Sequence, residues 1–180
     1  PVFARVLVVI GLSGFCALAA EVLWTRLLSL MLGGTVYNFS IILSAFLTGL
    51  GLGGLLGSMI ARRATQPHQW LGLCQLLQVF GVVWCTDLLT HTLPFWPGTN
   101  VADATLSHQL VTDFFRTSIA VLPATILWGA SFTLALSAAS GASHDPGRSV
   151  ASIYFSNTLG AVLGAVLGSL VLLPCLGTPH

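Results

Sequence analysis

The stretch SIILSAFLTGLGLGGLLGSMIA, residues 40–61, decides the fold because it carries no charged side chain and is apolar along most of its length. A helix of about 20 such residues crosses the roughly 30 Å hydrocarbon core of a bilayer. The uncharged region around it extends from residue 27 to residue 61. Three further uncharged stretches are long enough to cross, at residues 64–86, 117–144 and 149–180. The pattern predicts an all-α, polytopic membrane helix bundle.

The composition excludes an ordinary water-soluble globular protein. Of the 180 residues, 55% are hydrophobic and 6% are charged, and the mean hydropathy is +0.92. A soluble domain carries charge on about a quarter of its residues. The net charge is +1 and the longest basic run is Arg62-Arg63, so the chain lacks the surface with which nucleic-acid-binding proteins neutralise phosphates. We therefore expect membrane lipid, and no nucleic acid, as a partner.

The apolar segments divide the chain into about five transmembrane helices in a single membrane domain that covers residues 1–180. We expect these helices at residues 2–32, 36–61, 70–89, 110–139 and 150–173. Glycine and proline clusters at residues 33–34, 66–68, 94–98 and 144–147 separate them. Pro123 falls inside the fourth predicted helix. A membrane helix tolerates such a proline as a kink when a neighbouring group bonds the carbonyl that the proline frees.

The charges predict the orientation, because short cytoplasmic connections carry an excess of arginine and lysine. With the N-terminus inside and the C-terminus outside, the inner side sums to +3 and the outer side to −2. The expected location is the bacterial cytoplasmic (inner) membrane. A secretory signal peptide is the alternative for the first segment, since Arg5 precedes an apolar run that ends in an Ala-x-Ala-like site at residues 17–19. The apolar pattern continues past that site, which favours a membrane helix.

A set of polar residues falls toward the outer side of this topology, and ionisable groups inside membrane helices are costly enough to need a partner or a water-filled path. The predicted polar cluster consists of Glu21, Arg26, Asn38, Asp87, Asp113 and Arg116. It is either a substrate or ion site, or a set of interhelical locks and groups that reach the interface; the second interpretation is favoured. We expect polar partners on neighbouring helices for Glu21 and Arg26.

Two series of glycines repeat every four residues and predict close helix packing, because a backbone can approach a surface of small residues. The first glycine series is Gly49, Gly53 and Gly57, and the second glycine series is Gly160, Gly164 and Gly168. Static packing is a simpler interpretation than the sliding surface of a transporter. We expect the first series to pack inside the bundle and the second to lie against another polypeptide or a bound lipid.

The remaining reactive residue types indicate no site. The four cysteines form no C-x-x-C pair, and the five histidines lie in predicted loops or at the terminus without helical His-x-x-x-His spacing. No nucleophile has a base at a suitable spacing. We therefore expect no catalytic residues, no metal site, no cofactor-binding residues and no enzyme activity in this chain.

Two blocks of sequence resemble the membrane-integral spermidine synthase-like (polyamine aminopropyltransferase-like) family. The first block comprises residues 13–15, the E-x-x-W-x-R motif at residues 21–26, and residues 30–35 and 45–53. The second comprises residues 122–123, 129–132, 147–148, Tyr154, the N-T-L-G-A run at residues 157–161, and residues 173–177. The resemblance implies a multi-helix membrane module, to which some family members add an aminopropyltransferase-like domain of Rossmann type. This sequence has no strand–glycine loop–acidic pattern, so no catalytic domain is carried over.

These observations favour a non-catalytic membrane subunit or accessory module that packs against other membrane protein subunits of a larger complex. The alternative is a small transporter or ion-coupled carrier that uses the intramembrane residues Glu21, Arg26 and Asp87. Transporters usually contain paired repeats with broken helices, and the two halves of this chain show no convincing repeat.

Overall fold

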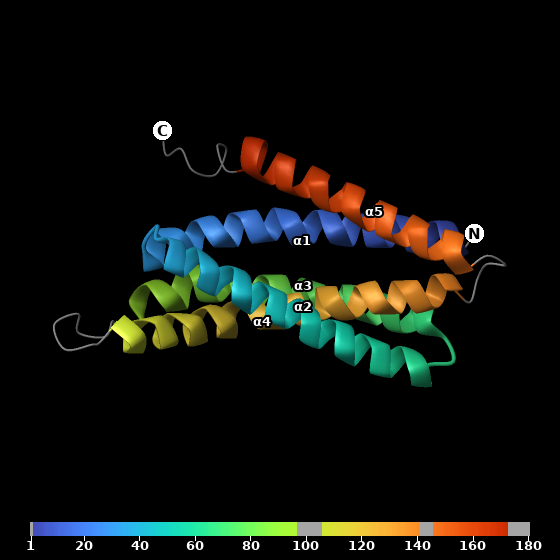
Figure 1. The fold of residues 1–180 in the computed structure, drawn as a ribbon, viewed down its shortest axis with the longest axis horizontal. Helices are drawn as coiled ribbons and strands as arrows, with labels where there is room; N and C mark the ends of the chain where they lie inside the picture. The colour runs from blue at the N-terminus through green and yellow to red at the C-terminus, as the bar shows by residue number, and fades with distance from the viewer. Residues whose placement is uncertain (1, 97–105, 141–145, 173–180) are drawn as a thin grey trace.

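The computed structural model describes residues 2–96, 106–140 and 146–172, and within these ranges the chain is helical with no strand. Figure 1 shows long helices lying side by side. They are α1 (Val2–Leu32), α2 (Val36–Arg63), α3 (Pro67–Asp87), α4 (Leu106–Ser140) and α5 (Pro146–Leu167). Short π- and 3₁₀-helical turns extend α3 as η1 (Leu88–Thr92) and η2 (Leu93–Phe95), and α5 as η3 (Gly168–Leu172). The predicted all-α fold is confirmed.

Several helices are longer than the sequence predicts, and their ends explain why. The helices α3 and α5 begin at Pro67 and Pro146, where prolines were expected to break the chain. Proline is favourable in the first helical turn because its missing N–H has no partner there in any case. The helix α2 continues through Arg62 and Arg63, whose positive charges suit a helix C-terminus.

All five helices are long and apolar enough to span a membrane. Their outward faces carry large apolar side chains, which a soluble monomer rarely exposes in such number. Examples with more than two thirds of the side chain exposed are Leu76, Phe80, Phe155 and Leu170. The chain therefore has the surface of an integral membrane protein, and these faces suit contact with lipid.

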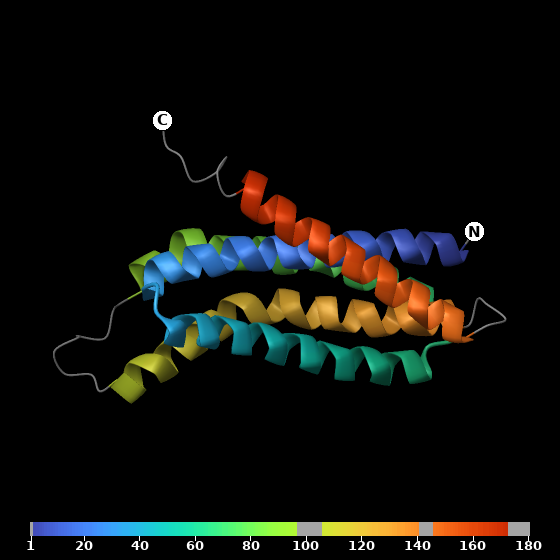
Figure 2. The ribbon, with the colours of Figure 1, turned by 45° about the horizontal axis from the view of Figure 1, so that its top comes forward.

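Helix α4 is the centre of the bundle. It packs along α2 and α3, whereas α5 packs mainly along α1 (Figures 1 and 2). In the most apolar part of α4, 56% of the residues are buried, against 17% in α5. The fold thus contains an α2–α3–α4 unit and an α1–α5 pair, and α4 joins the two.

Two apolar cores lie one after the other along the bundle. One contains Trp24 of α1 and Trp128 of α4, whose ring centroids are 5.6 Å apart, with Phe46 of α2 at 6.2 Å from Trp128. The other contains Ile10 of α1 and Leu134 of α4, both almost fully buried. Because α1 and α4 contribute to both cores, these two helices hold the unit and the pair together.

The first glycine series packs inside the bundle, as predicted. A Cβ added at any of its three glycines would lie within 3.0 Å of atoms of α4. The α4 residues that it would meet include Thr125, Ile126 and Ala130. The fit is reciprocal, since a Cβ on Gly129 of α4 would meet the backbone of Leu50 on α2. Small residues on both helices allow this close approach.

The second glycine series also packs inside the bundle, so the prediction that it lies against another polypeptide or a lipid is wrong. A Cβ on Gly160 or Gly164 would meet the backbone of Gly11 or Phe15 on α1. On the α1 side, Gly11 and Gly14 leave matching space for the backbone and side chains of α5. These two glycines are three residues apart, so α1 carries no four-residue glycine repeat that would mark it as the partner.

The proline in α4 is accommodated as the sequence predicts. Pro123 has no N–H to donate to the carbonyl of Ile119, four residues earlier. The indole Nε1–H of Trp84 on α3 donates to that carbonyl instead, at 3.1 Å. Helix α4 changes direction along its length (Figure 2). A side chain of the neighbouring helix therefore satisfies the backbone group that the proline leaves open.

Candidate functional site

The predicted polar cluster does not assemble, and Asn38 shows why. Its side-chain Nδ2 donates to the carbonyl oxygens of Leu32 and Gly33, the second at 2.9 Å. Gly33 has a φ of +96°, a conformation that glycine adopts readily. The hydroxyl of Thr35 caps the next helix by accepting from the backbone N–H of Asn38. Asn38 thus closes the turn between α1 and α2 and is not part of a polar cluster.

The other acidic residues toward this side interact with neighbours in the sequence. Asp87 lies 3.2 Å from Nδ1 of His91, one turn later, and both side chains are largely exposed. Asp113 lies 3.8 Å from Nη1 of Arg116. The Arg116 guanidinium also lies over the ring of Trp96, 5.9 Å from its centroid. The two ion pairs are local in the sequence, and among the described residues they do not form an ion-binding site across helices.

Among the residues that the structure describes, Glu21 and Arg26 lack the partners that we predicted. The Glu21 side chain is half-buried and that of Arg26 is exposed. Neither makes a hydrogen bond or an ion pair with any residue in the described part of the chain. Arg26 lies midway between the buried Trp24 and Leu28, and a shift of two helical positions turns a side chain to the opposite face. The geometry of α1 therefore directs Arg26 away from its own bundle.

The structure instead places a cavity of about 260 Å³ between α1, α2, α4 and α5. Most of its wall is apolar or aromatic, and none of its lining residues is charged. The lining residues are Ser13, Gly14, Ala17, Leu18, Phe46, Leu50, Gly54, Trp128, Gly129, Phe132, Thr133 and Asn157. Because Ala17 and Leu50 lie near the midpoints of their helices, the cavity is far from both ends of the bundle.

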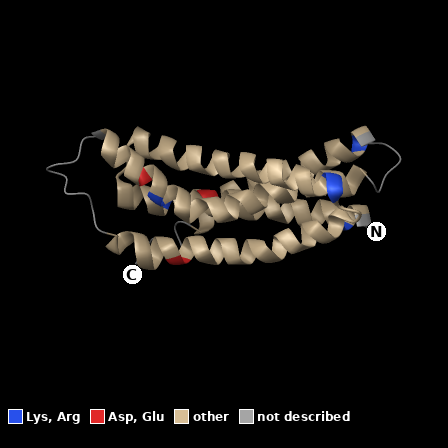
Figure 3. Cartoon of the chain, turned by 90° about the horizontal axis from the view of Figure 1, so that it is seen from below, with Lys and Arg blue, Asp and Glu red and all other residues tan. Residues whose placement is uncertain are grey.

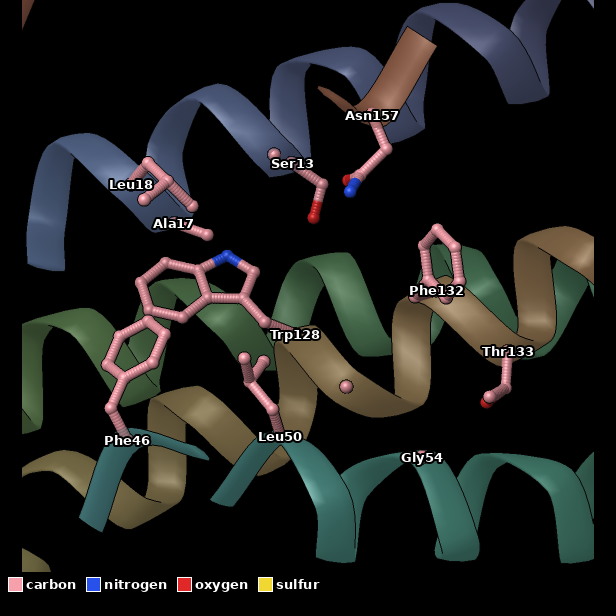
Figure 4. A pocket seen from close by; sticks show the side chains of 12 residues that line it. Ser13, Ala17, Leu18, Phe46, Leu50, Gly54, Trp128, Phe132, Thr133 and Asn157 are labelled. Atoms are coloured by element: carbon pink, nitrogen blue, oxygen red, sulfur yellow. The ribbon is translucent and has the colours of Figure 1, made fainter. Parts of the chain in front are cut away.

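A few polar atoms converge on this cavity (Figure 4). The Trp128 side chain is only 4% exposed, and its Nε1–H has no hydrogen-bond partner among the described residues. The Asn157 amide points into the space between the helices, toward the side of the cavity where Ser13 lies (Figure 4). The Ser13 hydroxyl accepts a bond of 3.4 Å from Nε2 of Gln75 on α3.

A second cavity, of about 330 Å³, lies on the α3 side and shares Ser13 and Trp128 with the first. Gln78 of α3 lines it. The Nε2 of Gln78 donates to the carbonyl of Ala124 at 3.2 Å, whereas its buried Oε1 has no partner within the described residues. Uncharged polar side chains from three helices, α1, α3 and α5, therefore line the two cavities that Trp128 of α4 shares.

This site could not be found among the charged residues of the sequence, because none of the residues that line the cavity is charged. The informative signal was the occurrence of amides and a hydroxyl in the middle of uncharged spans, at Ser13, Gln75, Gln78 and Asn157. Without the fold, nothing shows that these residues point toward one tryptophan. The site has hydrogen-bond donors and acceptors in apolar surroundings, so it suits recognition of an uncharged molecule. Across residues 2–96, 106–140 and 146–172, no three His, Cys, Asp or Glu side chains gather as metal ligands would.

Comparison with known proteins identifies no relative. The chain matches no protein-family model, no curated protein and no solved structure.

Proposed function

We propose that this chain is a non-catalytic subunit or accessory module that packs against other chains of a larger membrane complex. The observation that carries the proposal is the carboxyl of Glu21. It lies four residues beyond the midpoint of α1, which is about 6 Å along the helix. The hydrocarbon core extends about 15 Å on each side of its centre. Within the described residues this carboxyl has no partner.

Arg26 supports the same proposal because it is a second charge on α1 that has no partner among the described residues. Translocon-based scales assign about 2.5–3.5 kcal/mol to an arginine or aspartate at the centre of a membrane helix. A neighbouring subunit that supplies a cation to Glu21 and an acceptor to Arg26 would remove much of this cost. The surface of α1 around these two side chains is the proposed contact site.

The alternative transporter function has no specific support. Of its three proposed residues, Asp87 pairs with His91 on the exposed surface of α3 and η1. Glu21 and Arg26 lie on another helix and form no bond with Asp87. No charged path forms between these groups within the described residues.

The arginine distribution supports a cytoplasmic location for one end of the bundle. In Figure 3, most basic residues gather at the end where the N-terminus lies, and the acidic residues among those that the structure describes lie in the other half. Arg5, Arg62, Arg63 and Arg148 belong to helix ends that meet there. By the positive-inside rule, we propose that this end faces the cytoplasm of a bacterial inner membrane. We further propose that the chain is a membrane module of spermidine synthase-like type.

The test is the mass of the native assembly. The tagged chain is extracted from its own membranes in mild detergent and analysed by native mass spectrometry. We expect a complex heavier than the tagged monomer, and about tenfold less of it for Glu21→Leu, since an unmatched partner charge is strongly destabilising. Asp87→Leu removes a carboxylate that is already paired on an exposed face, so this control should assemble normally. A chain that is found only as the tagged monomer, or equal losses for both variants, would overturn the proposal.

A further inference from the structure

The central cavity contains a hydrogen-bond donor that the protein itself leaves unsatisfied. Indole nitrogen can only donate, and the Trp128 Nε1–H has no acceptor among the described residues although its side chain is more than nine-tenths buried. Figure 4 shows the indole at the cavity wall, with its nitrogen edge directed toward α1. Buried polar groups in native proteins almost always have partners. An acceptor on a molecule that enters the cavity would supply the missing partner.

The other polar groups restrict the charge of that molecule. The Asn157 amide and the Ser13 hydroxyl can each donate and accept, and neither bears a charge. No ionisable side chain lines the cavity. A charged ligand would remain unpaired in apolar surroundings, which is strongly unfavourable. The occupant is uncharged and carries acceptors that can face more than one wall.

The depth of the cavity excludes a phospholipid headgroup. Ala17 and Leu50 place it near the middle of the spans, whereas lipid ester groups lie near the surface of the hydrocarbon core, about 15 Å from its centre. An acyl chain reaches the midplane but offers no acceptor to Trp128. The molecule must carry its polar atoms into the centre of the bilayer.

The shape and walls of the cavity favour a planar ring. Its volume of about 260 Å³ exceeds the roughly 150 Å³ cavity that accommodates benzene in a soluble protein. Three aromatic side chains, Phe46, Trp128 and Phe132, line it. Aromatic faces pack well against flat rings. The cavity therefore provides aromatic surface and separate polar groups for a single ring.

Access from the lipid is available between α2 and α5. These helices line opposite sides of the cavity and have almost no direct contact, because α2 packs on α4 and α5 packs on α1. We propose that the cavity binds an uncharged, lipid-soluble carbonyl compound of the quinone class. One ring carbonyl accepts from Trp128 Nε1, and the opposite carbonyl faces Asn157 and Ser13.

The probe is a benzoquinone with a ten-carbon tail, added to the protein in nanodiscs of phosphatidylcholine. The chain has five tryptophans, so the labelled indole N–H signals are few, and Trp128→Phe identifies the one from Trp128. We expect a saturable shift of that signal. Affinity is read from quenching of the remaining tryptophans, of which Trp24 lies 5.6 Å from the Trp128 ring. Trp128→Phe should bind about fivefold more weakly, the effect of one net hydrogen bond.

Two further measurements separate ring recognition from general disruption. Trp70→Phe removes an indole outside the cavity and should bind with unchanged affinity. Gly54→Leu fills the cavity, and its Cβ would first meet Thr133 at an ordinary 3.9 Å, so this variant should fold but not bind. Decylbenzene has a similar ring and tail without carbonyls and should not compete. Three results would each overturn the proposal. They are the absence of a saturable shift, equal competition by decylbenzene, and a Trp128 N–H signal that exchanges with water and does not shift when the quinone is added.

Discussion

The seam between α2 and α4 and the seam between α1 and α5 use the same glycine spacing in different surroundings. In the first, α4 is enclosed by α2 on one side and α3 on the other, and more than half of its most apolar part is buried. In the second, α5 rests mainly on α1, and most of its surface faces outward. A glycine repeat therefore predicts close backbone contact, but it does not show how many helices depend on that contact.

The hydrogen bonds reinforce this difference. Two side chains of α3 donate to backbone carbonyls of α4, from Gln78 to Ala124 and from Trp84 to Ile119. In the described part of the α1–α5 seam, the Ser156 hydroxyl donates to the carbonyl of Leu7 at 2.7 Å. The α2–α3–α4 unit should therefore tolerate perturbation less well than the α1–α5 pair.

The largest expected effect is that of Gly53→Leu in the first seam. Its Cβ would clash with the backbone of Ile126, which cannot move without separating α2 from α4. We expect a loss of about 3 kcal/mol or more, at the upper end of overpacking effects, and little folded protein by size exclusion in mild detergent. Gly51→Leu is the matched control, because no atom lies within 4 Å of its added Cβ. Equal yields from both variants would contradict the assigned seam.

A smaller effect is expected for Gly164→Leu in the second seam, where the Cβ would meet the backbone of Phe15. Because α5 can move outward, we expect a loss of about 1–3 kcal/mol. Hydrogen exchange should show deprotection of α5 while α2 and α4 remain protected. Gly72→Leu on α3, which has open space at its Cβ, serves as the control. Deprotection of the whole bundle would show that the pair is not the weaker part.

The third effect tests the bond between α3 and α4 at the proline. Trp84→Phe leaves the Ile119 carbonyl without its donor and should cost about 1 kcal/mol, within the range measured for hydrogen bonds in membrane proteins. In a Pro123→Ala background the N–H of residue 123 can bond that carbonyl, so the same substitution should cost much less. A double-mutant cycle in thermal unfolding measures the coupling. Equal losses in both backgrounds would mean that Trp84 does not compensate for the proline.

The fold could be predicted from the sequence because helices in a membrane satisfy their own backbone, and the length of each apolar span marks one crossing. The same rule predicts that some neighbouring group bonds the carbonyl that Pro123 frees. It does not predict that this group is the indole of Trp84. Helix pairing was only half predictable. The repeat of the first glycine series predicts which face of α2 packs against another helix. Gly11 and Gly14 of α1 lack such a four-residue repeat, so the sequence does not mark α1 as the partner of the second series.

The cavity could not be predicted from the sequence for a different reason. Ser13, Trp128 and Asn157 come from three helices, and each is unremarkable in its own span. Only the rotation of each helix about its axis decides whether such a residue faces lipid, core or cavity. The predicted polar cluster rested on the cost of charged groups in lipid. Most of its members instead form local ion pairs or, in the case of Asn38, close the α1–α2 turn.

The smallest expected effect concerns Arg26 on the outward face of α1, where no described residue binds it. Arg26→Leu should change the free energy of unfolding of the isolated chain by less than about 0.5 kcal/mol, as for other surface substitutions. Arg116→Leu on α4 is the informative comparison. Arg116 is more than four-fifths buried, lies 3.8 Å from Asp113 and packs over Trp96, so its loss should cost about 1 kcal/mol or more. Thermal unfolding of both variants in the same detergent measures the difference. If Arg26→Leu destabilised the isolated chain as much as Arg116→Leu, Arg26 would stabilise its own bundle. A neighbouring subunit would then not be needed to account for a charged side chain at this position.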